Sequence, residues 1–414
     1  MSLNNTPSSE RIYIGFFGRT NAGKSSLINA LTKQQISLVS EIKGTTTDPV
    51  KKAMELLPLG PVMLIDTPGL GDDSVLGELR EKRTKEVLSQ IHVALIVVDA
   101  VIGIGETEKE LESLMKQANV PYFFVYNKSD LVKELPGHET RIASGKEDST
   151  NRDDLENKIY VSTVTGENLE LLKDKIASIK EVREERKLVS DLLEPNDHVV
   201  LVIPIDKAAP KGRLILPQQQ TIRDILDAGC SLSVCPVEKV RETLELLQKP
   251  PKLVITDSQV FGKVKEMVPE NIMLTSFSIL FARYKGDLES VVKGAYTLNY
   301  LKDGSKVLIS EGCTHHRQCG DIGTQKLPAW VLKYTGKQIV FEFTSGGDFP
   351  TDLSEYDLII HCGACMLNEK QMQHRMALAK EKKIPMTNYG IAIAHMNGIL
   401  ERSIEPFGYK NDGI

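Results

Sequence analysis

The strongest constraint on the fold is a glycine-rich loop close to the start of the chain. Residues 12–17 form an apolar run typical of a buried strand, and Gly-Arg-Thr-Asn-Ala-Gly-Lys-Ser follows at residues 18–25. An amphipathic helical pattern then continues to Leu31. This order of strand, loop and helix is the setting in which G-x-x-x-x-G-K-S binds phosphate: backbone N–H groups surround the phosphates, Lys24 reaches the outer oxygens and Ser25 binds Mg²⁺. The sequence therefore predicts a P-loop nucleotide-binding domain.

Further segments, in the expected order, specify a guanine nucleotide. Asp66-Thr67-Pro68-Gly69 follows a second predicted strand, where Asp66 can hold Mg²⁺ through water and Gly69 can sense the γ-phosphate. Asn127-Lys128-Ser129-Asp130 follows another predicted strand. The carboxylate of Asp130 can accept from the N1–H and the 2-amino group of guanine, and adenine lacks that pair of donors. We therefore expect GTP and GDP as the nucleotides.

Two more segments complete the predicted GTPase site. Ser162 and Thr163 lie in a loop that we expect on the base side, and Gly44-Thr45-Thr46-Thr47-Asp48 is typical of a switch region in which Thr46 binds Mg²⁺. The residues expected to act in hydrolysis are Lys24, Asn21, Thr46, Asp66 and Gly69. The residues expected to bind the nucleotide and its Mg²⁺ are Gly18, Asn21, Ala22, Gly23, Lys24, Ser25, Ser26, Thr46, Asp66, Gly69, Asn127, Lys128, Asp130, Ser162 and Thr163.

The loop sequence also indicates the class of GTPase. Leu70 stands where GTPases of the Ras type carry a glutamine that orients water. Asn21, within Asn-Ala-Gly-Lys-Ser-Ser, resembles the potassium-activated GTPases of tRNA modification and ribosome assembly, which implies that its amide oxygen helps to bind K⁺. The alternative is that Asn21 only stabilises the loop. Asp72, Asp73 and Glu78 are candidates for orienting water, and the sequence does not choose among them.

Length and periodicity predict several α/β domains. A chain of 414 residues exceeds what one core supports, and alternating strand and helix patterns predict mainly parallel sheets. We expect a P-loop GTPase domain of the TrmE and Era type at residues 1–180, followed by two smaller α/β domains at residues 188–271 and 272–414. The middle domain is small for an independent core, so we expect a homodimer that shares a sheet or helix layer.

Composition excludes several classes of protein. The formal net charge of −5 gives no general attraction to nucleic acid or membrane, and the polar N-terminus lacks the apolar segment of a signal peptide. We expect no membrane span and a cytoplasmic location. Six cysteines in so long a chain indicate reduced thiols rather than a disulfide scaffold. Of these, Cys230 and Cys235 are typical of core or loop positions.

Three of the four remaining cysteines follow two predicted strands. Residues 306–310 lead to Cys313 and His315, and residues 356–360 lead to His361-Cys362-Gly363-Ala364-Cys365. Because ligands collect at the carboxyl ends of strands in open α/β sheets, the two strand ends can bring three thiolates and two imidazoles together. The pattern favours a metal site, with cysteines that merely pack as the alternative.

The combination resembles the [FeFe]-hydrogenase maturation GTPases over essentially the whole chain. The matching features are the P-loop with Asn-Ala-Gly-Lys, the middle α/β domain, Cys-x-His, and His-Cys-x-x-Cys after a spacer of residues 316–360. The resemblance implies a [4Fe–4S] cluster bound by Cys313, Cys362 and Cys365, which makes residues 188–271 a dimerisation domain and residues 272–414 a cluster-binding domain. It also implies a scaffold that receives a transiently bound di-iron precursor from partner radical maturation enzymes and delivers it to apo-[FeFe]-hydrogenase.

The ligand set leaves alternatives open. Three cysteines leave one iron with an exchangeable position, for which His361, His315 and Glu311 are the candidates. Cys319 lies outside the family pattern and is a fourth thiol nearby. A rival interpretation is a ribosome- or tRNA-associated GTPase with a structural zinc site, which requires a closed tetrahedral set of Cys and His ligands. A second rival is a non-enzymatic module in which nucleotide only sets a conformation.

Overall fold

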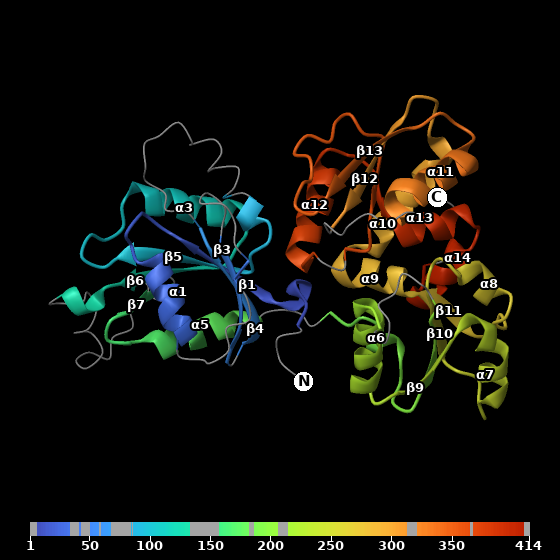
Figure 1. Cartoon of the computed structure of the whole chain (residues 1–414), viewed down its shortest axis with the longest axis horizontal. Helices are drawn as coiled ribbons and strands as arrows, with labels where there is room; N and C mark the ends of the chain where they lie inside the picture. The colour runs from blue at the N-terminus through green and yellow to red at the C-terminus, as the bar shows by residue number, and fades with distance from the viewer. Residues whose placement is uncertain are drawn as a thin grey trace, which may run out of the picture. The chain divides into compact units, whose positions relative to one another are not determined.

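The computed structural model describes residues 6–33, 41–42, 50–57, 59–67, 84, 86–132, 157–181, 186–205, 214–312, 321–364 and 367–409. The chain divides into two compact units, Met1–Glu184 and Glu185–Ile414 (Figure 1). Within the described residues, the first unit contains one seven-stranded sheet and the second contains two four-stranded sheets. The predicted α/β fold class, with mainly parallel sheets in successive parts of the chain, is confirmed.

The sheet of the first unit has the strand order β2-β3-β4-β1-β5-β6-β7. Strand β1 pairs in parallel with β4 and β5, and β6 and β7 continue the parallel part; β2 and β3 are antiparallel. The strands are β1 (Ile12–Phe17), β2 (Glu41–Ile42), β3 (Val50–Leu56), β4 (Gly60–Asp66), β5 (Val93–Asp99), β6 (Tyr122–Asn127) and β7 (Lys158–Tyr160). The helices are α1 (Lys24–Lys33), α3 (Glu106–Gln117) and α5 (Leu169–Glu181), with short 3₁₀ turns at Ser8–Glu10 and Ser129–Leu131.

The apolar run of β1 is buried on both faces of this sheet. Side chains alternate along a strand, so Ile14 and Phe16 enter one hydrophobic cluster while Tyr13 and Phe17 enter the other. This explains why β1 is continuously apolar, as the strands of covered parallel sheets are. The parallel arrangement also places the carboxyl ends of β1, β4, β5 and β6 at one edge, where the predicted nucleotide residues follow.

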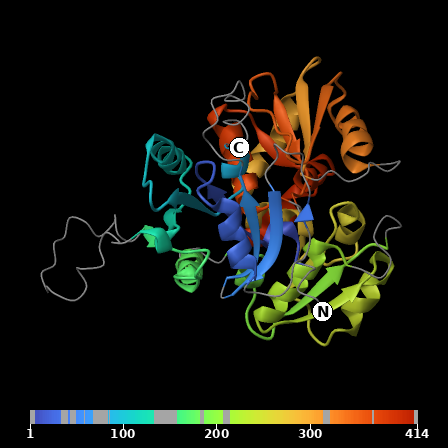
Figure 2. The same ribbon diagram turned by 60° about the vertical axis from the view of Figure 1, so that its left-hand side comes forward.

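The second unit has two all-parallel sheets, of strand order β11-β10-β8-β9 and β13-β12-β14-β15 (Figure 2). The strands are β8 (His198–Val202), β9 (Ser231–Cys235), β10 (Leu253–Thr256), β11 (Met273–Ser276), β12 (Lys306–Glu311), β13 (Val340–Ser345), β14 (Leu358–His361) and β15 (Met386–Asn388). The α-helices are α6 (Leu216–Asp227), α7 (Val240–Leu246), α8 (Phe261–Lys265), α9 (Phe277–Lys285), α10 (Leu288–Tyr296), α11 (Leu327–Thr335), α12 (Glu369–Glu381), α13 (Tyr389–Met396) and α14 (Leu400–Ile404). Shorter helical turns occur at Ser190–Leu192, Val237–Lys239, Thr297–Tyr300, Ile322–Lys326 and Glu405–Phe407.

The middle sheet shares a hydrophobic core with helices from the last part of the chain. Val254 of β10 belongs to the same buried cluster as Ile391 of α13, and the Thr275 hydroxyl donates to the carbonyl oxygen of Ser403 at 2.8 Å. Strand β11 pairs with β10, so the middle sheet extends past residue 271, where we expected the third domain to begin. The order of segments along the chain does not match their packing, because helices α13 and α14 from the end of the chain cover the middle sheet.

No helix within the described ranges combines the length and the apolar character that a bilayer span requires.

Candidate functional site

The P-loop packs too closely against its neighbours for any residue but glycine at two positions. Gly18 has a φ of +140°, and a Cβ atom there would lie 2.3 Å from the carbonyl oxygen of Val97. Gly23 has a φ of +96°, and its Cβ would lie 2.2 Å from Nδ2 of Asn127. Glycine adopts these conformations without steric cost. The loop is therefore fixed between β5 and Asn127, the last residue of β6.

The lysine predicted to be catalytic and the predicted Mg²⁺ ligands lie together at this edge. Lys24 is buried, and its Nζ donates to the carbonyl oxygens of Gly18 at 3.0 Å and Arg19 at 2.9 Å. Burial lowers the pKa of Lys24, and the Asp66 charge acts in the opposite direction. The Ser25 hydroxyl donates to Oδ2 of Asp66 at 2.7 Å. The other oxygen, Oδ1, is buried without a hydrogen-bond partner among the described residues, so this donor set suits a water-bridged Mg²⁺.

Asn21 lies exposed in the loop with a φ of +63°. Asparagine is one of the few non-glycine residues that tolerate this left-handed conformation. The backbone alone thus gives a reason for asparagine at this position, while its exposed side chain stays accessible to a cation. Both interpretations of Asn21 are compatible with this geometry.

The base-side residues form a connected set. Asn127 is 1% exposed, its Nδ2 donates to the Ala22 carbonyl at 3.4 Å, and its Oδ1 accepts from the Thr163 backbone N–H at 3.4 Å. The Ser162 hydroxyl donates to Oδ1 of Asp130 at 2.5 Å. Asn127 therefore joins the P-loop to the loop after β7, and Ser162 orients the carboxylate predicted to face guanine.

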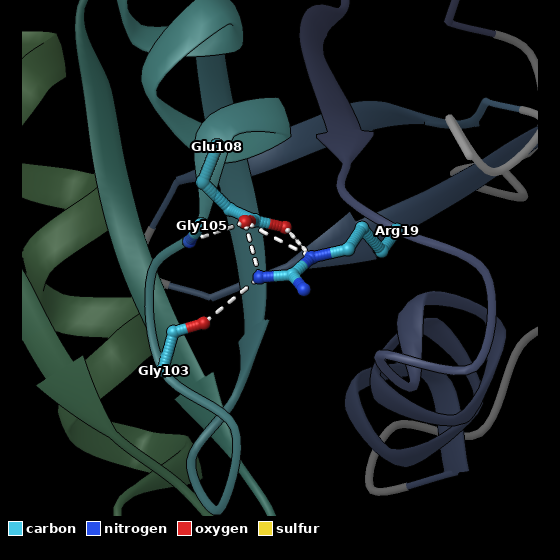
Figure 3. A network of polar contacts seen from close by, with 4 residues as sticks. All are labelled: Arg19, Gly103, Gly105 and Glu108. Atoms are coloured by element: carbon cyan, nitrogen blue, oxygen red, sulfur yellow. Dashed lines mark hydrogen bonds and ion pairs between the residues drawn. The ribbon is translucent and has the colours of Figure 1, made fainter.

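Sequence reasoning missed a partly buried ion pair between the P-loop and α3 (Figure 3). The Arg19 guanidinium donates to both carboxylate oxygens of Glu108, with a shortest distance of 2.6 Å, and to the Gly103 carbonyl at 3.0 Å. The Gly105 backbone N–H donates to the same carboxylate at 2.9 Å. The pair ties the P-loop to the first turn of α3. No sequence signal identifies it, because Arg19 occupies a variable position of the motif.

A second missed pair joins Lys128 to Asp99 at 2.5 Å, with Lys128 in a left-handed conformation at a φ of +66°. Asp99 is the last residue of β5, at the same sheet edge as the P-loop. The rule that functional groups collect at the carboxyl ends of parallel strands identifies this position from sequence.

In the second unit, the two strands with the cysteine and histidine motifs are parallel neighbours. Ser310 of β12 lies opposite His361 of β14, and the Cys362 N–H donates to the Ser310 carbonyl at 2.9 Å. The backbone N–H of Gly312 then lies 2.9 Å from the Cys362 sulfur, and that of Ala364 lies 3.4 Å from it. Two N–H donors favour the thiolate, the form of cysteine that binds metals, so this site fits a thiolate-ligated metal.

Several predicted residues fall outside the described ranges. They are Thr46, Gly69, Asp72, Asp73, Glu78, Cys313, His315, Cys319 and Cys365. Among the residues that the structure does describe, no three His, Cys, Asp or Glu side chains form a group arranged to hold a metal ion.

The geometry disfavours His361, one candidate for the fourth iron ligand. The ring is fully buried, Nδ1 lies 2.8 Å from the Cys362 carbonyl oxygen, and Nε2 lies 2.8 Å from the Arg375 guanidinium. A carbonyl only accepts and a guanidinium only donates, so Nδ1 carries the proton and Nε2 is the acceptor. Burial and the Arg375 charge lower the pKa of His361 to about 3. Both nitrogens are thus engaged, because the last side chain of β14 points into the core.

Glu311, another candidate, ends β12 and is half-buried. The Tyr389 hydroxyl lies 3.4 Å from its Oε1, and a Cβ atom on Gly323 would lie 2.2 Å from the same oxygen. Burial raises the pKa of Tyr389, and the Glu311 and Cys362 charges add to this, so the phenol stays a hydrogen-bond donor. The carboxylate of Glu311 therefore lies at the same edge as the Cys362 sulfur.

Three protein families match successive parts of the chain. Residues 13–128 match the 50S ribosome-binding GTPase family. Residues 188–286 match the Hydrogen maturase F dimerization domain, and residues 289–406 match the Hydrogen maturase F tetramerization domain.

Curated relatives match a smaller part. GTPase Der of Kosmotoga olearia is 29% identical over 177 residues, which are 42% of this chain and 39% of the relative. The tRNA modification GTPase MnmE of Carboxydothermus hydrogenoformans is 32% identical over 185 residues, which are 43% of this chain and 38% of the relative. This chain therefore spans about two fifths of the length of these relatives. The crystal structure of the G domain of the T. maritima FeoB iron transporter aligns with a TM-score of 0.30 and 24% identity, covering 41% of this chain and 99% of that one.

We expect Glu108→Gln to loosen α3. Hydrogen bonds to charged groups contribute about 2 kcal/mol, so amide exchange in α3 should rise roughly 30-fold at pH 7 in hydrogen-exchange mass spectrometry of the full chain. Burial raises the pKa of the Glu108 carboxyl, but the hydrogen bonds from Arg19 and Gly105 outweigh it and hold the pKa below its ordinary 4.5. The stabilisation is therefore complete above pH 4.5 and is lost as pH falls through the lower pKa of the folded state.

The matched control is Glu110→Gln, an exposed position on the same helix. Its α3 exchange should equal that of the unsubstituted chain. Equal α3 protection in Glu108→Gln and Glu110→Gln at pH 7 would show that the Arg19–Glu108 pair does not hold the helix.

Proposed function

Since this chain belongs to the hydrogen maturase F family of GTPases, we propose that it is a GTP-hydrolysing scaffold that binds a [4Fe–4S] cluster and delivers a di-iron precursor to apo-[FeFe]-hydrogenase. The observation that carries the proposal is the meeting of β12 and β14, where the Gly312 N–H lies 2.9 Å from the Cys362 sulfur. The proposed partners are the radical maturation enzymes that supply the precursor and the apo-hydrogenase that receives it, in a reducing cytoplasm and without nucleic acid.

The first unit carries a GTPase domain, which implies GTP, GDP and Mg²⁺. In the proposed mechanism, Lys24 exchanges its two carbonyl contacts for the β- and γ-phosphate oxygens. Ser25 would hold Mg²⁺ directly, and the Asp66 oxygen that has no partner among the described residues would hold it through water. We also propose that Thr46 completes the Mg²⁺ ligands and that Gly69 contacts the γ-phosphate. Asn21 helps to bind K⁺, which supplies the positive charge that an arginine finger supplies in other GTPases.

In the second unit, Cys313, Cys362 and Cys365 are the proposed cluster ligands. When bound through three thiolates, a [4Fe–4S] cluster offers one iron with an exchangeable position. Glu311 and His315 remain as candidates for that position, while His361 acts through its hydrogen bonds to the Cys362 carbonyl and Arg375. The Cys362 sulfur is held by the N–H donors of the two strand ends.

We propose a homodimer that pairs through the edge strand β9. Within the described residues β9 pairs only with β8, and Val234 is 49% exposed. The Ser231 backbone N–H donates to the Asp197 carbonyl, and the Cys235 carbonyl accepts from the Ile203 N–H. Alternate residues of β9 therefore form the backbone hydrogen bonds to β8. The N–H groups of Leu232 and Val234 then point away from β8, where a second copy can accept them.

The potassium proposal predicts faster GTP hydrolysis in KCl than in NaCl at equal ionic strength. Asn21→Gly should erase the difference, because glycine keeps the φ of +63° without strain and removes only the amide. Asn119→Gly is the matched control, another asparagine in a left-handed conformation, with a φ of +50°, at the end of α3. It should keep the potassium preference. Equal rates in both salts for the unsubstituted chain would refute the proposal.

The cluster proposal predicts about four iron and four sulfide per chain after anaerobic reconstitution, with broad visible absorption. Cys362→Ser should abolish or strongly weaken cluster binding while GTP hydrolysis survives, since the nucleotide residues lie in a separate unit with its own core. Cys235→Ala, a buried cysteine of the middle sheet, is the control and should keep the cluster.

Stoichiometric zinc without iron in the purified chain would instead support the ribosome- or tRNA-associated alternative. Cys319→Ser tests the exchangeable iron. If that change alone prevents assembly, four cysteines hold the cluster and no iron keeps an open position.

The proposal of a dimer that pairs through β9 predicts that Val234→Pro halves the mass measured by light scattering. Proline removes an outward N–H and leaves the bonds of β9 to β8 in place, which edge strands tolerate. Val234→Ala keeps the N–H and is the control, which should remain dimeric. A dimer of unchanged mass and dissociation constant in Val234→Pro would exclude pairing through this edge.

A further inference from the structure

Arg375 of α12 is a buried cation surrounded by neutral groups. It is 4% exposed, and its guanidinium donates to Nε2 of His361 at 2.8 Å, to the Ser310 hydroxyl at 3.3 Å and to the Gly346 carbonyl at 2.6 Å. The guanidinium carbon lies 4.8 Å from the centre of the Phe349 ring. No carboxylate of the described residues forms an ion pair with it.

A buried charge without a counter-charge is costly, since neutral hydrogen-bond acceptors replace only part of the lost hydration. Burial lowers the pKa of Arg375 to about 10, which leaves it charged at neutral pH, while the charges of Cys362 and Asp348 act in the opposite direction. Asp348 is exposed and therefore screened by water. The other group is Cys362, a proposed ligand of the metal centre, and the guanidinium faces it through His361 and Ser310.

A second buried cation supports the same loop. Lys285, the last residue of α9, is 5% exposed, and its Nζ donates to the carbonyls of Ala364 at 2.7 Å and Leu367 at 3.1 Å. Ala364 has a φ of +52°, so this contact holds Ala364 in a conformation that alanine rarely adopts. Two buried cations, Lys285 and Arg375, therefore lie close to the described residues around Cys362.

We propose that Arg375 is the buried counter-charge of the anionic metal centre at this edge and raises its reduction potential. This inference rests on the proposed cluster. A [4Fe–4S]²⁺ core with three thiolates carries a net charge of −1, and one electron taken from dithionite changes it to −2. A fixed positive charge stabilises the more negative state more strongly. The chemistry therefore assigns Arg375 a positioning and electrostatic role through His361 and Ser310, without contact with iron.

The competing explanation is purely structural, in which Arg375 only joins β12, β14 and the turn after β13. It predicts that any substitution that breaks these hydrogen bonds destabilises the fold and leaves the potential of an assembled cluster unchanged. The counter-charge explanation predicts a dependence on charge at this position.

The test is a dithionite titration of reconstituted full-length protein, followed by EPR, together with iron and sulfide analysis and melting of the apo form. Arg375→Met should make the midpoint potential more negative by ~59 mV. For a one-electron couple, this corresponds to about a tenfold lower equilibrium constant for reduction. Arg375→Lys should keep most of the potential. Arg402→Met is the matched control, because Arg402 likewise donates to backbone carbonyls, those of Lys265, Val268 and Pro269, and should not move the midpoint.

Each outcome decides the question. If Arg375→Met assembles a cluster with an unchanged midpoint, or if its apo form fails to fold, the counter-charge role is wrong and the arginine is structural. If apo Arg375→Met melts as the unsubstituted chain does but binds no iron, while Arg375→Lys binds it, the charge is required. If the unsubstituted chain itself assembles no cluster, the proposed cluster fails, and with it the counter-charge role that depends on it.

Discussion

The proposed metal site depends on the parallel pairing of β12 with β14, whose carboxyl ends carry Glu311 and Cys362; this edge of the sheet is called the metal edge. With Ser310 opposite His361, the residues that follow both strands leave the sheet at one level, and the Gly312 N–H reaches the Cys362 sulfur. A shift of one residue would turn Cys362 to the other face, because side chains alternate along a strand. The same rule operates in the first unit, where the ends of β1, β4 and β6 bring Lys24, Asp66 and Asn127 to one edge.

The sheet edge of the first unit that carries the predicted nucleotide residues was largely predictable, because these residues lie in short motifs attached to strands. The strand before each motif fixes where the motif begins, and the glycines fix the path of the loop. The positions of Gly18, Gly23, Lys24 and Asp66 follow from these local rules. The Arg19–Glu108 pair did not follow, because it joins residues far apart in the chain and depends on how α3 packs.

The metal edge was predictable in its strands but not in its electrostatics. Two apolar runs followed by cysteines indicated that the strand ends meet. Sequence did not show that the His361 ring is buried, since a histidine beside a cysteine has the same spacing whether it points outward or into the core. Arg375 and Lys285 lie on helices without a motif, and only packing brings them to the cysteine loop.

The shared core of the second unit has a consequence for how such a chain can arise. Helix α14 and β11 lie in segments that match different families, yet the Thr275 hydroxyl binds the Ser403 carbonyl and both pack in one cluster. A gene fusion that acquired one segment without the other would expose apolar faces that, among the described residues, each segment covers for the other. Residues 185–414 therefore pack as one unit that is best inherited whole, whereas the GTPase domain is a separate compact unit.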